Sequence, residues 1–581
     1  KFEQYEGGKL RIDIASDALD GYDRINFNTS SVTLGGTLQT SLLNGYSSLA
    51  PLDVFSFVNP MSTNSYFRYV TGDIVTQGGT EKMVKAIYSC GTVSLALSGP
   101  DTFTLASSQS ESGWGDRRNW VSSSNTYLPT QIDTVIIGAG KEMSHQDGND
   151  TVANLILESG SYLYQNGDSL TVRNSANISG TLNIWEGNVS VANATSVSGR
   201  VRVGGGNLSL NGTTSITGSL NVSSGTVTMN GTNNLGGQID VSDTLIANGT
   251  NNVSGSMQVS TGSVVLNGNT RGSGNITIGG SCSDCGEEEF SFNERLAPSG
   301  GSLTINNASQ SALAVDLQSG NLTLGGNVRL GSLSVADGQV TGNASSRLVV
   351  AGSFSQTGGN MSLADAALLQ DSGTLRVGSI SADNLLLQAR NGDIAQAGGS
   401  ALHVRSQLVA SASSGIVLNS SGNQIAGFAA NNSGSGNITL TNALNTVDAT
   451  AVAINGVTTA SGNVSIDNTG GVVTSAIGDK AGFLGNLPMM DDGSTLSTSN
   501  LLTSLGIDAS GQVKSANGSV SLVTHSPLTI GSGGVSATGT ITLTASASSG
   551  SNDALVINGV LVTTGGNINL SAGDSMTINA N

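Results

Sequence analysis

The chain has 581 residues and an unusual composition, with 80 glycines, 4% aromatic residues, 11% charged residues and a formal net charge of −18. A chain of this length exceeds one globular core, so we expect more than one structural region. The acidic balance excludes the basic stripe that neutralises nucleic-acid phosphates, so no nucleic acid is expected as a partner. No apolar run approaches the roughly 18 residues of a membrane span, so we expect no transmembrane segment in this chain.

Residues 1–105 are predicted to form a smaller β-rich N-terminal module, either a β-sandwich or a partial solenoid. This region holds most of the tyrosines and phenylalanines and three of the seven prolines. Between Lys9 and Ile14 every second residue is apolar, which is typical of a strand with one buried face. The change of composition after this region marks the boundary of the module.

Residues 106–150 are predicted to lead into a solenoid and to cap it. Trp114 and Trp120 are expected to pack over the open end of the first coil, where an exposed core would otherwise meet water. The alternative is that these two indoles stack on carbohydrate. The loop-like stretch from Asp147 to Asp150 is rich in oxygen atoms, which makes Ca²⁺ a weak possibility beside the main expectation of no cofactor and no metal.

Residues 151–280 contain one short pattern repeated six times. Apolar residues recur at offsets 2, 4, 10, 14 and 16 of each repeat, with Gly272 as the one exception. The paired offsets indicate period-two strands, and three short strands in about 19 residues suit one turn of a three-sided coil. The predicted fold class is therefore all-β, a right-handed parallel β-helix of about 19 residues per three-strand coil. The repeats begin at Asp168, Gly187, Gly206, Gly225, Asp243 and Gly262, which are 19, 19, 19, 18 and 19 residues apart.

Asn-Gly pairs recur at the same spacing and are predicted to form the corners of the coils. Both residue types tolerate a positive φ, which a tight corner needs. Asparagines stacked from coil to coil are also expected to hydrogen-bond along the stack. The predicted corner residues are Asn211, Gly212, Asn230, Gly231, Asn248, Gly249, Asn267 and Gly268.

Residues 281–300 interrupt the coils. Cys282 and Cys285 form a Cys-Ser-Asp-Cys sequence, for which a small-loop disulfide is favoured over free thiols. No second cysteine pair or histidine pair completes a zinc site. Insertions leave a solenoid as loops and often carry recognition, although a solvated excursion is the alternative. The candidate contact residues in this loop are Glu287, Glu288, Glu289, Phe290 and Phe292.

The coils are predicted to resume, less regularly, over residues 301–435. Residues 436–581 then carry a longer duplication, because Gly436–Leu440 recurs 103 residues later as Gly539–Leu543. The stretch 477–505 is predicted to be an insertion within this longer unit. Since its second copy is truncated at the end of the sequence, we expect the chain to be a piece of a larger array.

The repeats resemble the filamentous haemagglutinin-like and autotransporter-passenger-like β-solenoids of large bacterial surface adhesins. The similarity lies in segments such as Asn391–Gln396 and Gly436–Leu440, and in the N-terminal pattern Tyr-Asp-x-Ile-x-Phe that begins at Tyr22. The resemblance implies an exported rod that is attached to the bacterial cell surface or shed from it. It implies no particular receptor, and the secretion signature of the family does not occur in this sequence.

The sequence offers no clear catalytic constellation. Parallel β-helices also serve as polysaccharide lyases and hydrolases, which need several carboxylates or a base gathered on one face. Here the carboxylates do not share an offset over adjacent coils. His145, His403 and His525 lie more than 100 residues apart and are expected to be ordinary surface or loop residues. We therefore expect that the protein is not an enzyme.

The expected function is structural and adhesive. The sequence favours a non-catalytic, extracellular segment of a bacterial surface adhesin that mediates attachment or self-association. The expected partners are other copies of the chain, other surface proteins, glycans, or the surface of a host or neighbouring cell. A subunit of an extracellular filament or sheath that assembles end to end is the main alternative. A polysaccharide lyase or hydrolase is a distant one.

Overall fold

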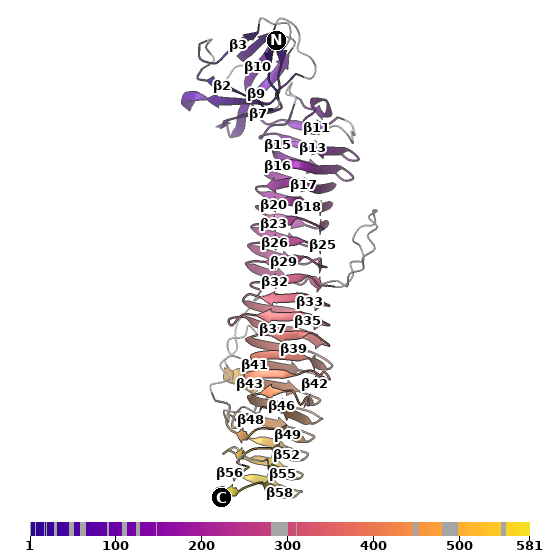
Figure 1. The fold of residues 1–581 in the computed structure, drawn as a ribbon, viewed down its shortest axis with the longest axis vertical. Coiled ribbons are helices and arrows are strands. Elements are labelled where there is room, and N and C mark those ends of the chain that lie inside the picture. The colour runs from indigo at the N-terminus through magenta and orange to yellow at the C-terminus, as the bar shows by residue number, and fades with distance from the viewer. Residues whose placement is uncertain are drawn as a thin grey trace. The chain divides into compact units, whose positions relative to one another are not determined.

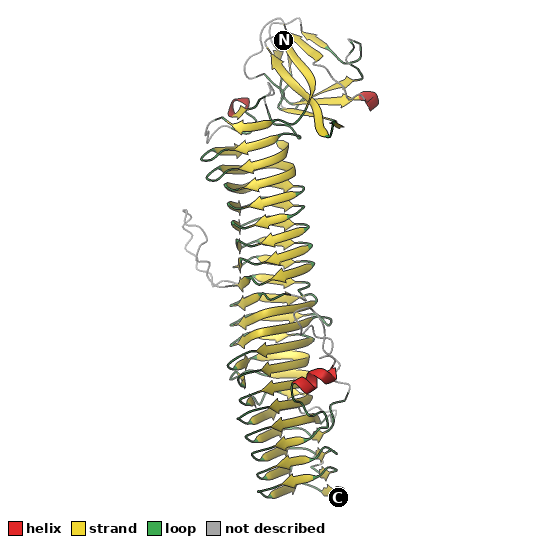
Figure 2. Ribbon diagram, turned by 180° about the vertical axis from the view of Figure 1, so that it is seen from behind, coloured by secondary structure: helices red, strands yellow, loops and turns green. Residues whose placement is uncertain are grey.

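The computed structural model confirms the predicted fold class. It is all-β, with 60% strand and 2% helix, and contains a parallel β-solenoid of about 19 turns, about 20 residues apart, with a small N-terminal β module. Two compact units, Lys1–Gly249 and Thr250–Asn581, are distinguished by their internal contacts. Successive coils stack within each unit (Figures 1 and 2). The structure describes residues 2–5, 7–16, 18, 20–27, 32–45, 52–57, 65–89, 92–106, 113–123, 128–146, 148–279, 300–308, 311–444, 451–478, 498–547 and 553–580.

The N-terminal module of the first unit contains three small sheets. Strands β2, β5 and β7 are parallel, β1 pairs with β4, and a mixed sheet has the order β3-β6-β10-β9-β8. The alternation predicted for β2 is present, since Ile12 and Ile14 are buried in the module core beside Leu38 and Val93. The strands are β1 (Phe2–Glu3), β2 (Lys9–Ile14), β3 (Ile25–Phe27), β4 (Val32–Thr33), β5 (Thr37–Leu42), β6 (Leu52–Phe57), β7 (Tyr69–Gly72), β8 (Ile74–Gln77), β9 (Thr80–Ser89) and β10 (Thr92–Ser98), with a 3-10 turn η1 at Leu43–Gly45.

The solenoid sheet begins at β11, at the end of the predicted module, where β11 pairs in parallel with β13. The remaining elements of the first unit are β11 (Thr102–Leu105), the 3-10 turn η2 (Arg117–Asn119), β12 (Trp120–Val121), β13 (Thr134–Ile137), β14 (Glu142–His145), β15 (Asn149–Leu157), β16 (Tyr162–Ile178), β17 (Thr181–Val191), β18 (Ala194–Val197), β19 (Arg200–Val203), β20 (Asn207–Leu210), β21 (Thr214–Ile216), β22 (Ser219–Val222), β23 (Thr226–Met229), β24 (Thr232–Leu235), β25 (Gln238–Val241) and β26 (Thr244–Ala247).

Each regular coil consists of three short strands that pair with the same strands of the next coil. Leu208 of β20 pairs with Val227 of β23, and Leu220 of β22 pairs with Ile239 of β25. These side chains point inward and are almost completely buried, so like residues stack along the core. Burial of apolar surface therefore depends on the neighbouring coils, as expected for a repeat that cannot bury its own apolar face.

The middle strand of several regular coils carries a second inward residue, which is polar and which the apolar pattern did not reveal. In the first unit these buried residues are Thr195, Thr214 and Asn233. Thr195 pairs with Thr214, and Thr214 pairs with Asn233. The Asn233 amide donates to the carbonyl of Asn248 at 2.9 Å, so a polar column follows the apolar ones along the core.

The corner asparagines form a ladder in the first unit. The Nδ2 atom of Asn230 donates to Oδ1 of Asn211 at 2.8 Å, and Nδ2 of Asn248 donates to Oδ1 of Asn230 at 2.7 Å. The positive φ lies only on the glycines, with 103° at Gly231 and 83° at Gly249. In the second unit, Asn267 accepts a hydrogen bond from Asn306 at 2.5 Å, and Gly268 has a φ of 78°. Gly212 does not have a positive φ, so its corner needs only the absence of a Cβ, which would lie 1.9 Å from the carbonyl oxygen of Asn193.

The second unit continues the same parallel pairing over coils of less regular length. Its elements are β27 (Thr250–Val253), β28 (Ser256–Val259), β29 (Ser263–Leu266), β30 (Asn269–Gly272), β31 (Asn275–Ile278), β32 (Ser302–Ile305), β33 (Ala314–Leu317), β34 (Asn321–Leu324), β35 (Asn327–Val335), β36 (Gln339–Gly342), β37 (Arg347–Gln356), β38 (Asn360–Ser362), β39 (Asp365–Gln370), β40 (Leu375–Val377), β41 (Ser379–Ala389), β42 (Ile394–Gln396), β43 (Leu402–Ala412), β44 (Ile416–Leu418), β45 (Gln424–Ile425), β46 (Gly427–Asn432), β47 (Ile438–Asn442), β48 (Val452–Thr459), β49 (Val464–Asn468), β50 (Val472–Thr474), α1 (Thr498–Ser504), β51 (Val513–Ser515), β52 (Val520–Thr524), β53 (Leu528–Ile530), β54 (Val535–Ala537), β55 (Ile541–Ala545), β56 (Leu555–Ile557), β57 (Leu561–Thr563), β58 (Ile568–Ala572) and β59 (Met576–Ile578).

An apolar column on the outside of these coils is covered by the segment that contains α1 (the red helix nearest the C-terminus in Figure 2). The column continues from coil to coil through direct strand pairing. Its members are Val349, Ala367, Leu386, Val409 and Ala429, and the residues that pack against them are Ile477, Leu501, Leu502, Leu505 and Ile507. The described part of the predicted insertion 477–505 therefore contacts its own solenoid.

A glycine-capped turn ends α1 on this surface. The amide of Gly506 donates to the carbonyl of Thr503 at 3.0 Å, and the amide of Ile507 donates to that of Leu502 at 3.0 Å. This is the Schellman pattern, with Gly506 at a φ of 68° and the apolar contact between Leu502 and Ile507 that usually accompanies it. The carbonyl of Leu505 accepts hydrogen bonds from two outward side chains of the coils.

We predict that Leu220→Ala lowers the free energy of unfolding of the first unit by about 2–5 kcal/mol, because it leaves a cavity in a close-packed column. The matched variant is Asn221→Ala, which changes the adjacent outward residue and is expected to alter stability by about 0.5 kcal/mol or less. Urea denaturation followed by circular dichroism measures both. Equal losses in the two variants would contradict the inward assignment of Leu220.

We predict that Gly506→Ala loosens α1 from the coils. The new Cβ would sit at a positive φ and 2.6 Å from Nδ2 of Asn431, with an expected cost of about 1–2 kcal/mol. Faster amide hydrogen exchange at Leu505 and Ile507 is the readout. Gly478→Ala is the control, because a Cβ there has no atom within 4 Å. Unchanged exchange in Gly506→Ala would show that the cap does not hold the helix.

Candidate functional site

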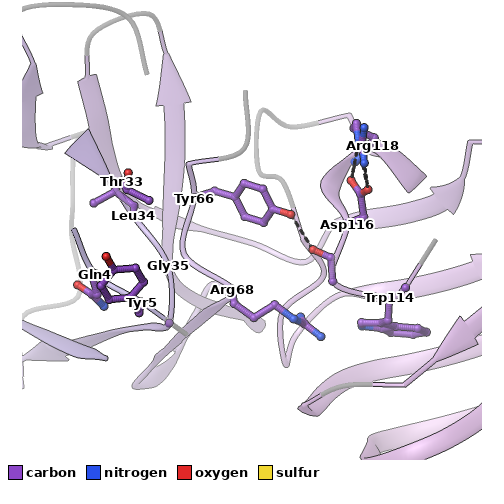
Figure 3. A pocket seen from close by; sticks show the side chains of 13 residues that line it. Gln4, Tyr5, Thr33, Leu34, Gly35, Tyr66, Arg68, Trp114, Asp116 and Arg118 are labelled. Atoms are coloured by element: carbon purple, nitrogen blue, oxygen red, sulfur yellow. Dashed lines mark hydrogen bonds and ion pairs between the residues drawn. The ribbon is translucent and has the colours of Figure 1, made fainter. Parts of the chain in front are cut away.

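The candidate site is a cavity of about 440 Å³ in the first unit, between strands of the N-terminal module and the segment that leads into the coils (Figure 3). Its volume lies in the range of small-molecule sites, roughly 300–1,000 Å³. Tyrosines, arginines, an indole and backbone amides surround it. The lining residues are Gln4, Tyr5, Thr33, Leu34, Gly35, Gly36, Tyr66, Arg68, Gly113, Trp114, Gly115, Asp116 and Arg118.

A buried ion pair holds the N-terminal module against the lead-in segment. Lys85 of β9 donates to the carboxylate of Asp133, and both side chains are almost completely buried. Asp133 also accepts the backbone amides of Asp101 at 2.7 Å and Thr130 at 2.8 Å, and the Thr130 hydroxyl at 2.6 Å. A buried charge pair is tolerated when its other lone pairs are satisfied in this way, so the two walls of the cavity are fixed relative to each other.

A second network lies beneath the cavity and includes Arg68 from its lining. The Nη1 and Nη2 atoms of Arg68 donate to the two oxygens of Asp150 at 3.0 and 2.6 Å. The guanidinium also lies 4.6 Å from the centroid of the Tyr69 ring. Burial lowers the pKa of Arg68, but the charge and hydrogen bonds of Asp150 outweigh it, so the net pKa is raised. Arg68 is therefore a fixed cation at this site.

His145 is buried within this network, which corrects the expectation that it is a surface or loop residue. Its Nε2 atom lies 2.9 Å from Oδ2 of Asp150, and the ring is fully covered. The reason is that β14 carries it into the first coils, where Trp114 packs edge-on against the imidazole at 5.3 Å. His403 and His525 are exposed, as expected. The His145–Asp150 pair is not part of the cavity lining.

Trp114 and Trp120 pack against each other at the start of the coils. Their rings are 5.0 Å apart at 72°, and the Nε1 of Trp120 donates to the carbonyl of Trp114 at 2.8 Å. Both indoles are buried, which is the packing arrangement expected from the sequence. The Nε1 atom of Trp114 has no hydrogen-bond partner among the described residues. This donor is itself buried, so Trp114 contributes its ring and not a hydrogen bond to the cavity wall.

The rim of the cavity is shaped by a hydrogen-bonded turn. The hydroxyl of Tyr66 donates to the carbonyl of Gly115 at 2.8 Å, as Figure 3 shows. Asp116 caps η2 by accepting the backbone amide of Arg118 at 2.9 Å, and its carboxylate pairs with the Arg118 guanidinium. The side-chain hydrogen bond from Arg118 lowers the pKa of Asp116 below its ordinary value of 3.8. The Asp116 carboxyl at the rim therefore stays ionised at neutral pH.

We predict that the carboxyl of Asp116 titrates below pH 3.8 and that Arg118→Gln moves its midpoint up toward 3.8. Because the pKa is depressed in the folded state, the pair stabilises the fold above pH 3.8 and this contribution is lost as the pH falls through the lower folded value. Carbon-13 NMR of the carboxyl is the measurement. Arg117→Gln, which removes a weaker charge effect, is expected to shift the midpoint less; an equal shift would contradict the assigned pairing.

The cavity offers donors and aromatic edges for a polar ligand. Within the described chain, no group of three or more histidine, cysteine, aspartate or glutamate side chains is arranged to hold a metal ion. The weak calcium expectation concerned Asp147–Asp150. Asp147 lies outside the described residues, while Oδ1 of Asn149 accepts the hydroxyl of Ser169 at 2.6 Å and Asp150 is engaged by Arg68 and His145.

The loop predicted to carry recognition lies outside the described residues, which end at Gly279 and resume at Gly300. The disulfide and the contact role predicted there stay predictions. They concern Cys282, Cys285, Glu287, Glu288, Glu289, Phe290 and Phe292.

The cavity and its supporting network were missed by reasoning from the sequence. Lys85 pairs with a residue 48 positions away and Arg68 with one 82 positions away, so no local spacing connects them. The one available signal was charge, because in a chain with 22 lysines and arginines the three cations Arg68, Lys85 and Arg118 all lie in the first 118 residues.

No helix in the described part is long and apolar enough to cross a membrane. A scan of protein-family models finds no matching family, and searches of the curated proteins and of the solved structures find no match.

Proposed function

We propose that this chain is a non-catalytic structural protein of the bacterial cell surface that mediates attachment. The observation that carries the proposal is the regular solenoid of about 19 turns. A stack of coils repeats the same outward positions many times, so it supports extended binding surfaces built from residues on successive coils. The sequence resemblance to large surface adhesins favours the same function.

The geometry of the cavity supports binding more than catalysis. Its cations are held by carboxylates, Arg68 by Asp150 and Arg118 by Asp116. His145, the one histidine nearby, is buried against Asp150 and outside the cavity lining. General acid–base chemistry requires a titratable group within reach of the substrate, whereas these groups hold the walls of the cavity in place.

We predict that antibody against this chain labels intact cells that produce it, or their medium, and that protease added outside removes the label. A cytoplasmic protein of the same cells is the control for lysis. Label that appears only after the cells are opened would contradict the surface location.

The proposal that the chain is not an enzyme has its own test. Purified protein incubated with a panel of acidic and neutral polysaccharides is expected to release no new reducing ends and no unsaturated products. Release of either would instead support the β-helix lyase or hydrolase alternative.

A further inference from the structure

Aromatic residues gather on the outside of two consecutive coils in the first unit. Tyr162 and Tyr164 of β16 point outward on either side of the buried Leu163, and their rings stack at 6.1 Å with an angle of 9°. On the next coil Trp185 of β17 has 51% of its surface exposed. The other two tryptophans of the chain are buried, so an exposed indole on a polar outer face needs an explanation.

A β-bulge directs Trp185 outward and holds it in place. Gln165 pairs with Ile184 and Asn166 pairs with Glu186, which leaves Trp185 without a partner in the ladder. The indole lies on Gly204 of the following coil, where a Cβ would come within 2.6 Å of its ring. Bulges often change the direction of a side chain beside a binding site. Here Gly204 has no Cβ, so the Trp185 ring can pack directly on its backbone and is held in place.

Two arginines follow on the next coil, beside these aromatic rings. Arg200 pairs across the coils with Thr181 and Ser219, and Arg202 with Asn183 and Asn221. Among the described residues neither arginine forms an ion pair. Their four ladder partners are neutral and polar, in a chain with a net charge of −18.

The outward residues that pair with Arg200 and with Arg202 on successive coils form two rows. The nearest carboxylates in these rows lie at the ends of the rows. Glu142 pairs with Tyr162 at one end, and Asp240 pairs with Asn221 at the other. Asp240 accepts a hydrogen bond from Gln238 at 3.0 Å. The positive charge of the rows is therefore confined to their middle, between the tyrosines and this aspartate.

A further feature points to a ligand at this place. An open groove of about 490 Å³ lies beside Arg200, and its lining includes Gly180, Gly199 and Gly218. Arg200 therefore borders an open space that a ligand can enter.

We propose that this surface binds a linear polysaccharide that carries carboxylates, a polyuronate. The inference rests on the proposed attachment function and names its ligand class. Aromatic rings pack against the apolar C–H faces of sugar rings. Arginine recognises carboxylates with paired hydrogen bonds. Coils about 4.8 Å apart place the tyrosines, Trp185 and the two arginines on three successive coils, so an extended polymer that lies across them meets both kinds of contact. We name this surface the aromatic–arginine face, and it consists of Tyr162, Tyr164, Trp185, Arg200 and Arg202.

The experiment measures binding of the whole chain to polygalacturonate by isothermal titration calorimetry at about 0.15 M salt, where charges beyond about 8 Å are screened. Wild type is expected to bind, and to bind fully methyl-esterified polygalacturonate at least tenfold more weakly. The double variant Arg200→Gln with Arg202→Gln, and Trp185→Ala separately, are each expected to weaken binding about tenfold or more. Unchanged circular dichroism shows that each variant is folded.

Arg376→Gln is the matched control, because Arg376 is an exposed outward arginine on a coil of the second unit. It is expected to leave the affinity unchanged. The proposal is overturned if wild type does not bind, if the double variant binds as wild type does, or if Arg376→Gln weakens binding equally. Failure of binding with surface labelling intact would reject this ligand class alone, whereas an intracellular location would reject the attachment function.

Discussion

Everything in this molecule depends on parallel pairing between successive coils. A single coil of about 20 residues cannot pair its own strands or bury its own apolar side chains. Its backbone groups are therefore hydrogen-bonded, and its apolar side chains buried, only by the coils on either side. Leu208 on Val227 and Leu220 on Ile239 show the same register in different strands. Because that register is strict, inward positions must repeat, whereas outward positions are free to vary.

The freedom of the outward positions is used in two different ways. In the first unit, aromatic and arginine side chains occupy neighbouring outward rows and remain accessible, with Trp185 51% exposed. In the second unit, an outward apolar row from Val349 to Ala429 is covered by the α1 segment of the same chain. The same scaffold thus carries a candidate ligand surface and a self-covered surface, and only the chemistry of the outward residues distinguishes them.

The sequence predicts the solenoid well because the inward residues repeat every coil, and the offsets of Leu220 and Ile239 alone place their strand. It fails where one inward residue is polar, since Thr214 and Asn233 interrupt no apolar pattern. The Asn233 amide donates to the carbonyl of Asn248, whereas the buried hydroxyl of Thr214 has no hydrogen-bond partner among the described residues. It fails again at the cavity. Arg68 finds Asp150 through tertiary packing, which has no periodicity that a single sequence could reveal.

The segment that contains α1 also lengthens the connection between two coils that are adjacent in the stack. Val457 pairs with Val513 and Val464 with Val520, so these coils are joined through 56 residues where most are joined through about 20. Loop closure grows only with the logarithm of length, so the longer connection costs about 0.9 kcal/mol more than an ordinary one. Burying even one leucine of α1 offsets that cost. A solenoid can therefore acquire long excursions between coils with little thermodynamic penalty, provided that each returns in register.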